Sequence, residues 1–118
     1  MNLEVSRGVA VVHSDTVVIT DTGAALDLMA TARYTTGCDR IAIPKSAVAE
    51  DFFALSTGMA GEILQKFVNY HTKLAIFGDY SHYTSKALKD FIRESNQGRH
   101  IFFVVDEQTA IDTLSTAR

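Results

Sequence analysis

The stretch KLAIFGDYSHYTSKALKDFIRE, residues 73–94, decides the fold. It begins with a short apolar run, Leu74–Phe77, which Gly78 and Asp79 close. A polar loop follows, and then apolar residues recur at helical spacing, at Ala87, Leu88, Phe91 and Ile92. Continuous apolar runs are typical of strands buried on both faces, and a spacing of three and four residues is typical of helices. The stretch therefore predicts a buried strand, a polar loop and a helix, which together form one βα unit.

The same plan recurs along the rest of the chain. The Arg7–Gly8 pair predicts the turn of an early hairpin, and apolar runs at Val17–Ile19, Ile41–Ile43 and Ile101–Val105 predict further strands. A helical pattern follows each of these runs. Alternating strands and helices predict a mostly parallel sheet with helices on both faces. We predict one α/β domain over residues 1–118, in which an N-terminal β-hairpin is followed by four βα units with flanking helices.

Composition argues against several classes of partner. Of the 118 residues, 47% are hydrophobic and 21% charged, which is usual for one globular domain. The net charge of -3 gives no basic footprint for nucleic acid, and no apolar run approaches the roughly 20 residues of a membrane helix. The lone Cys38 has no partner for an internal disulfide, which fits a reducing compartment. We expect a cytoplasmic protein that binds neither nucleic acid nor membranes.

No motif in the sequence indicates a metal or a cofactor. The four histidines are widely spaced and pair with no cysteine in the manner of zinc ligands: His13, His71, His82 and His100. The glycine-rich motifs GxGxxG and GxxxxGK[ST] are absent, and so is the nucleophile elbow GxSxG. We therefore expect no metal and no cofactor, and the sequence leans against a common cofactor enzyme.

The loop after the Leu74–Phe77 run is the richest in candidate ligand-binding side chains. Ligands of open α/β sheets gather beyond the carboxyl ends of the strands, where this loop lies. Its candidate side chains are Asp79, Ser81, His82, Tyr83 and Ser85. His82 has the chemistry of a general base, but the sequence pairs it with no nucleophile. The favoured interpretation is structural: Asp79 bonds loop amides, Thr84 or Ser85 caps a helix, and His82 is solvated.

A second candidate site lies at the start of the helix that follows residue 58. Ser56, Thr57 and Gly58 precede its apolar stripe, so a phosphate on either hydroxyl would meet the positive end of the helix. The alternative is a capping serine and two glycines, Gly58 and Gly61, retained for packing, and the strong preference for serine at helix caps favours it.

Two resemblances extend this interpretation. Residues 50–99, EDFFALSTGMAGEILQKFVNYHTKLAIFGDYSHYTSKALKDFIRESNQGR, resemble a family of small bacterial proteins known only as a domain of unknown function. That resemblance covers nearly the whole chain and implies no activity. The order of elements also resembles, more distantly, the STAS domain of anti-sigma factor antagonists.

The STAS resemblance implies a phosphorylation switch at the start of a helix. Its motif is an acidic residue, two hydroxyl residues and a glycine, and the matching run here is Leu55-Ser56-Thr57-Gly58. Thr57, next to Gly58, matches the phosphorylated position. Leu55 departs from the acidic residue that the motif has, which puts recognition by a kinase in doubt.

Three hypotheses for the function remain open. The first, which we favour, is a non-enzymatic STAS-like module whose unknown protein partner docks around Ser56–Gly58. The second is a small-molecule-binding domain or minor enzyme, with a concave pocket lined by Asp79, His82 and Tyr83 together with Asp51 or Ser56. The third is a homodimer whose only visible property is assembly, with an apolar patch supplied by Phe52, Phe53 and Met59 if these residues are not part of the core.

Overall fold

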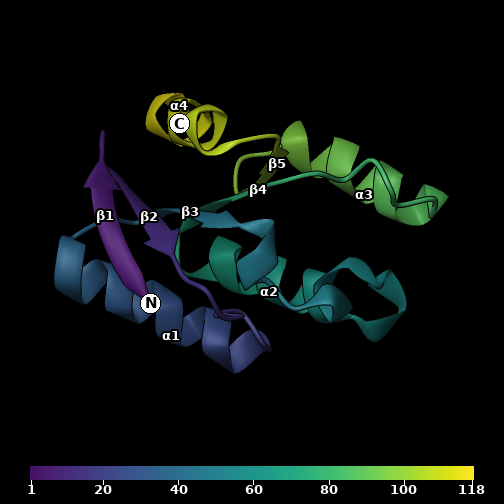
Figure 1. Cartoon of the computed structure of the whole chain (residues 1–118), viewed down its shortest axis with the longest axis horizontal. Coiled ribbons are helices and arrows are strands. Elements are labelled where there is room, and N and C mark those ends of the chain that lie inside the picture. Colours follow the sequence, from purple (N-terminus) through teal and green to yellow (C-terminus); the bar gives the residue numbers. More distant parts are fainter.

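A five-stranded sheet organises the computed structural model, which describes residues 1–118 (Figure 1). Its strands lie side by side in chain order: β1 (Asn2–Ser6), β2 (Val9–His13), β3 (Arg40–Pro44), β4 (Lys73–Phe77) and β5 (Ile101–Val104). β1 pairs antiparallel with β2, and every later neighbour is parallel. The predicted α/β class, with its N-terminal hairpin and mostly parallel sheet, is confirmed.

Helices cover both faces of the sheet. They are α1 (Thr22–Thr36), α2 (Met59–Asn69), α3 (Lys86–Asn96) and α4 (Glu107–Thr116). The larger core lies under α1, α2 and α3, and a smaller core lies under α4 alone. Figure 1 shows α4 on the upper side of the sheet and α1 and α2 below it. None of the helices combines the length and the apolar character needed to cross a membrane.

Acidic side chains just before α1 and α4 cap these two helices. The Asp21 carboxylate accepts a hydrogen bond from the Ala24 amide at 2.7 Å, and the Asp106 carboxylate accepts one from the Thr109 amide at 2.8 Å. These bonds satisfy amides that have no partner inside the helix. Because each helix follows a parallel strand, all four helices begin at the carboxyl edge of the sheet, which is where the candidate site residues lie.

The predicted strand at Val17–Ile19 is wrong. The segment forms no strand of the sheet, and Ile19 makes only an isolated bridge to Val48. Val18 and Ile19 donate their amides to the Ala47 carbonyl, and the Ile19 carbonyl accepts from Ala49. The backbone groups of Val18 and Ile19 are thus satisfied by the loop after β3, and of this apolar run only Ile19 is fully buried. β2 supplies the strand that precedes α1.

The condition for the apolar patch of a homodimer is not met, because two of its three residues belong to the core. Between β3 and α2 the chain makes three short 3-10 turns: Lys45–Ala47, Glu50–Phe53 and Leu55–Thr57. The middle turn carries Phe52, which is 0% exposed, and Phe53, which is also buried. The Phe52 ring meets the rings of Phe53 at 5.0 Å and Phe103 at 6.2 Å. Only Met59 keeps part of its surface.

Candidate functional site

Lys45, Glu50 and Tyr83 form a polar cluster at the carboxyl edge of the sheet. The Lys45 ammonium lies 3.2 Å from one carboxylate oxygen of Glu50, and the Tyr83 hydroxyl donates to the other at 2.7 Å. The Lys45 nitrogen also lies over two aromatic rings, 4.8 Å from the centroid of Phe53 and 4.9 Å from that of Tyr83. Such cation–π contacts add to the ion pair, so the cluster ties the loop after β4 to the turns after β3.

The cluster shifts the pKa values of its own members. The hydrogen bond from Tyr83 lowers the pKa of Glu50, and the Lys45 ammonium adds to this against a partial burial that opposes it. Burial works against the charge on Lys45, but the bonds to Tyr83 and Glu50 outweigh it and raise the pKa of Lys45. Burial, with a contribution from Glu50, raises the pKa of Tyr83. Near neutral pH the cluster is therefore an ion pair with a neutral phenol, and it holds no group poised to transfer a proton.

Gly78 allows this arrangement by its lack of a side chain. A Cβ atom built on Gly78 would lie 2.7 Å from the Cβ of Lys45, closer than such atoms approach one another. Gly78, which directly follows β4, thus allows the ends of β3 and β4 to approach each other closely.

Replacing Tyr83 by phenylalanine tests whether the cluster stabilises the fold. The variant loses the bond to Glu50, whose side chain is 68% exposed, so we expect a loss in the free energy of unfolding of less than about 1 kcal/mol. Since the bond lowers the pKa of Glu50, its contribution is present above the ordinary carboxyl pKa of 4.5 and disappears as the pH falls through the lowered value. Urea unfolding at pH 7 and at pH 3 should show a smaller difference from wild type at pH 3 than at pH 7. An equal difference at both values would contradict this role.

The Asp79–Ser85 loop is hydrogen-bonded largely within itself. The Asp79 carboxylate accepts from the Ser81 amide at 2.8 Å, and this bonding to Ser81 lowers the pKa of Asp79. Ser85 caps α3 by accepting from the Leu88 amide at 3.2 Å. The half-buried Tyr80 donates to the Ile76 carbonyl at 2.8 Å. These contacts match the structural interpretation of the loop.

His82 and Ser81 are among the exposed members of the loop. The His82 ring lies against Tyr83, with centroids 4.1 Å apart. A shallow depression of about 460 Å³ adjoins the loop and is lined by Gly78, Asp79, Tyr80, Ser81 and Val105. His82, Tyr83, Asp51 and Ser56 do not line it. Asp79 and Ser81 are thus brought together at a concave surface, and the other predicted ligand-binding residues lie outside it.

Ser56 and Thr57 differ sharply in their surroundings. The Thr57 hydroxyl lies 2.8 Å from each of two carbonyl oxygens to which it can donate, those of Asp51 and Ala54, and it accepts from the Met59 amide at 3.3 Å. Ser56 is exposed, and its hydroxyl makes no hydrogen bond. The residue before α2 is Gly58, in a left-handed conformation with no side-chain cap. A capping role for Ser56 is therefore wrong, and its hydroxyl is free.

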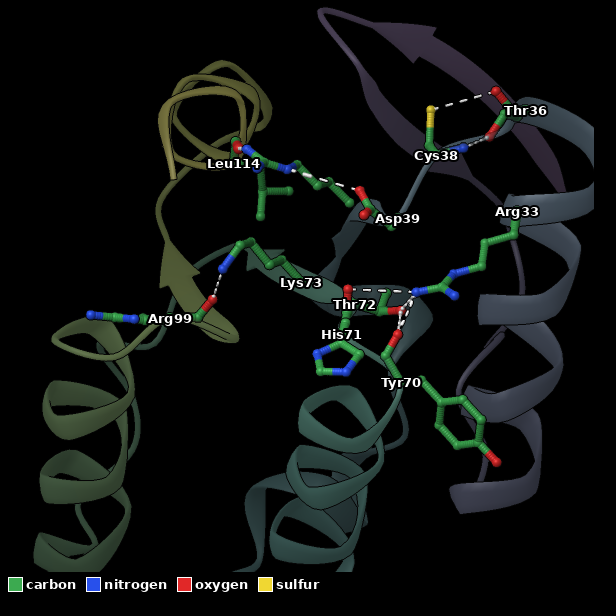
Figure 2. A network of polar contacts seen from close by, with 11 residues as sticks. Arg33, Thr36, Cys38, Asp39, Tyr70, His71, Thr72, Lys73, Arg99 and Leu114 are labelled. Carbon is green, nitrogen blue, oxygen red and sulfur yellow. Dashed lines mark hydrogen bonds and ion pairs between the residues drawn. The ribbon is translucent and has the colours of Figure 1, made fainter. Parts of the chain in front are cut away.

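A basic network occupies the opposite edge of the sheet (Figure 2). The Arg33 guanidinium, at the end of α1, donates to the Tyr70 carbonyl and to the Thr72 hydroxyl at 2.8 Å. Arg40 donates to the Leu114 carbonyl at the end of α4, and Lys73 donates to the Arg99 carbonyl. Cations near the negative ends of helices are favourable, so these contacts stabilise the fold.

Sequence reasoning missed Lys45 and Glu50, although a signal for Lys45 was present. Lys45 directly follows the Pro44 that ends β3, and parallel strands bring their carboxyl ends to one edge, so it had to lie near Asp79. Nothing in the sequence placed Glu50 beside Tyr83, since their contact depends on the path of the 3-10 turns.

The chain matches the family model DUF4180, described as a domain of unknown function, over residues 5–114. The chain belongs to this family. The match spans all five strands at least in part and includes both candidate loops, so the DUF4180 unit is the whole sheet with its helices. A search of curated proteins and a search of solved structures each found no significant match. The DUF4180 description assigns no activity, and no three His, Cys, Asp or Glu side chains lie together as a metal site would require.

Proposed function

We propose that this DUF4180 chain is a non-enzymatic regulatory or protein-interaction module of STAS-like architecture that acts in the bacterial cytoplasm. The observation that carries the proposal is the free, exposed Ser56 hydroxyl beside the start of α2. The order of elements supports it, since a hairpin leads into successive βα units whose strands lie in chain order. The free, buried Cys38 fits the reducing compartment.

The state of the other polar side chains supports a role without catalysis. Asp79 is bonded to its own loop, Tyr83 to Glu50, and Ser85 to the helix that it caps. A catalytic site needs a nucleophile or base whose reacting atom is free to meet a substrate. Of the loop side chains, those of His82 and Thr84 make no hydrogen bond, and both stand exposed on the surface.

Ser56 suits a phosphorylation switch better than Thr57. A phosphate on Thr57 would displace the hydroxyl from the Asp51 and Ala54 carbonyls and from the Met59 amide, and so disturb the turn that begins α2. A phosphate on Ser56 would break no hydrogen bond. The STAS resemblance implies phosphorylation of Thr57, whereas the hydrogen bonds favour phosphorylation of Ser56.

A phosphate at Ser56 would change the charge of a surface that is already acidic. Glu50 and Asp51 precede it, and Glu62 lies in the first turn of α2, where its carboxylate accepts from the Thr22 hydroxyl at 3.1 Å. Phosphorylation adds a charge of about -1.5 to -2 near neutral pH. We infer that the unmodified surface binds its protein partner and that the charge added by phosphorylation weakens this binding, because it repels the neighbouring carboxylates and reshapes the surface.

Binding by charge variants at Ser56 tests this switch. A partner is first cross-linked to the wild-type protein in its host and then purified, and its affinity for each variant is measured by titration calorimetry. Ser56→Asp should bind at least about tenfold more weakly than wild type, and Ser56→Ala should bind as wild type does. The matched control is Ala87→Asp, which adds the same charge to the exposed first turn of α3. Equal affinities for Ser56→Asp and Ser56→Ala would contradict the switch.

A small-molecule site is the second candidate function, and the depression beside Asp79 is the observation that favours it. Ligand screening by protein-observed NMR tests it. A ligand of this site would shift the Ser81 and Val105 amide resonances, and its binding would weaken in Asp79→Asn. A screen in which no compound moves these resonances would remove the candidate.

A further inference from the structure

The two outer edges of the sheet differ in whether a side chain bonds to their backbone groups. At the β5 edge, the Asn96 side chain accepts from the Phe103 amide at 2.7 Å and donates to the Phe103 carbonyl at 3.1 Å. A side-chain amide thus takes the place that the backbone of another strand would take. At the other end of the sheet, β1 pairs only with β2, and no side chain bonds to its outer edge. Open edges bind further strands, so β1 is the place where this sheet can grow.

The hairpin turn determines which residues of β1 face outward. Arg7 and Gly8 both have positive φ, 53° and 78°, as a two-residue type I′ turn requires. In such a hairpin the flanking pair, Ser6 and Val9, exchanges hydrogen bonds, and every second pair along the strands does the same. The backbone groups of Leu3 and Val5 therefore point away from β2, to the open edge.

Leu3 and Val5 also place an apolar stripe along this edge. Both lie on the face of the sheet that α1 covers, opposite the core residues Val12 and Ala10. Val5 is 52% exposed, and Met1, two residues before Leu3, is 60% exposed. A groove of about 300 Å³ runs beneath the edge and is lined by Met1, Asn2, Leu3, Thr31, Thr35 and Thr36. The rest of the chain therefore covers only part of this apolar stripe.

We propose that β1 pairs antiparallel with β1 of a second copy, with Leu3 opposite the second copy's Leu3, so that two sheets join into one. In this register Met1 lies opposite the second copy's Val5, and Asn2 lies opposite the second copy's Glu4. About six backbone hydrogen bonds form between the outward groups. The exposed Met1 and Val5 side chains cover one another over the two grooves, which gives each of them an apolar neighbour.

Shifting the second copy toward the hairpin turn makes β1 less complementary to itself than this register does. Moving the second copy by two residues would place Leu3 opposite Val5 and Glu4 opposite Glu4, where two carboxylates would repel each other. Moving it two residues further would place Leu3 opposite Arg7 in the turn and leave Met1 unpaired. The pairing of Asn2 with Glu4 avoids both faults and allows a hydrogen bond between amide and carboxylate. Self-complementarity of this kind is what a two-fold symmetric interface needs.

Sedimentation equilibrium tests the dimer with two variants of one residue. Wild type should behave as twice its chain mass of 12.9 kDa at micromolar concentration. Val5→Pro removes a backbone amide that makes no hydrogen bond to β2 but would donate one to the second copy. It should therefore raise the dissociation constant of the dimer by at least about tenfold. Val5→Thr keeps that amide and should lie between Val5→Pro and wild type. A wild-type protein that stays monomeric at high concentration would overturn the proposal.

Disulfide cross-linking tests the register and does not depend on how well Val5→Pro folds. With Cys38 replaced by serine, a mixture of Asn2→Cys and Glu4→Cys proteins should form a cross-linked heterodimer on oxidation, because these residues face each other at close range. Glu4→Cys alone should stay uncrosslinked. Cross-linking of Glu4→Cys alone, or no cross-linking in the mixture, would overturn the proposed register.

Discussion

Replacing Phe52 by alanine should lower the free energy of unfolding by about 3–5 kcal/mol. Phe52 is 0% exposed and lies in a short 3-10 turn, between the rings of Phe53 and Phe103. The loss combines the apolar surface that the ring no longer buries with a cavity that the neighbouring rings cannot fill. A loss of this size is a large part of the stability of an ordinary domain. Urea unfolding followed by circular dichroism measures it.

Two further variants make the Phe52 result specific. Tyr34→Ala removes an aromatic side chain that is 92% exposed, so its free energy of unfolding should stay within about 0.5 kcal/mol of wild type. Phe52→Leu retains most of the buried volume and should fold even if the alanine variant does not. If Phe52→Ala were as stable as Tyr34→Ala, the 3-10 turns would form a detachable surface segment, and their placement in the core would be wrong.

Replacing Asn96 by alanine should lower the free energy of unfolding by about 2 kcal/mol, since it removes two hydrogen bonds to Phe103. It should also change how the protein associates, because the edge of β5 then exposes an unpaired amide and carbonyl in an apolar strand. We expect higher-order species to appear in sedimentation velocity as the concentration rises, beyond any dimer that the wild type forms.

Asn69→Ala is the matched control for this variant. Asn69 is the last residue of α2, as Asn96 is of α3, but its side chain bonds only to Gln65, at 2.9 Å. Its loss should cost less than about 0.5 kcal/mol and leave the association unchanged. Similar behaviour of the two variants would mean that Asn96 acts only as a helix-end residue and does not protect the edge of the sheet.

The sequence predicted those parts of the fold that depend on neighbouring residues. Ser85 caps α3, as predicted, because a capping side chain needs only an amide three residues away. The run Leu74–Phe77 became β4 because a strand buried on both faces has to be apolar throughout. In these cases the residues that determine the local structure lie within a few positions of it in the sequence.

The errors concern long-range contacts. Val17–Ile19 has the composition of a strand, but its hydrogen-bond partners lie about 30 residues later, at Ala47 and Ala49, and they lie outside the sheet. Phe52 and Phe53 are buried by Phe103, which is further away still. For the candidate site, the sequence identified Asp79 and Tyr83 but missed Lys45 and Glu50. The path of the loop after β3 sets those contacts, and no local pattern encodes it.

Site-resolved mass spectrometry of Ser56 and Thr57, in protein purified from its own host under several growth conditions, tests the proposed switch most directly. The two residues are adjacent, so the fragment ions have to separate them. The account predicts phosphate on Ser56, whose hydroxyl is free, and none on Thr57, whose hydroxyl is bonded to the turn before α2. A Ser56 that stays unmodified under every condition would contradict the switch and direct the search to the depression beside Asp79.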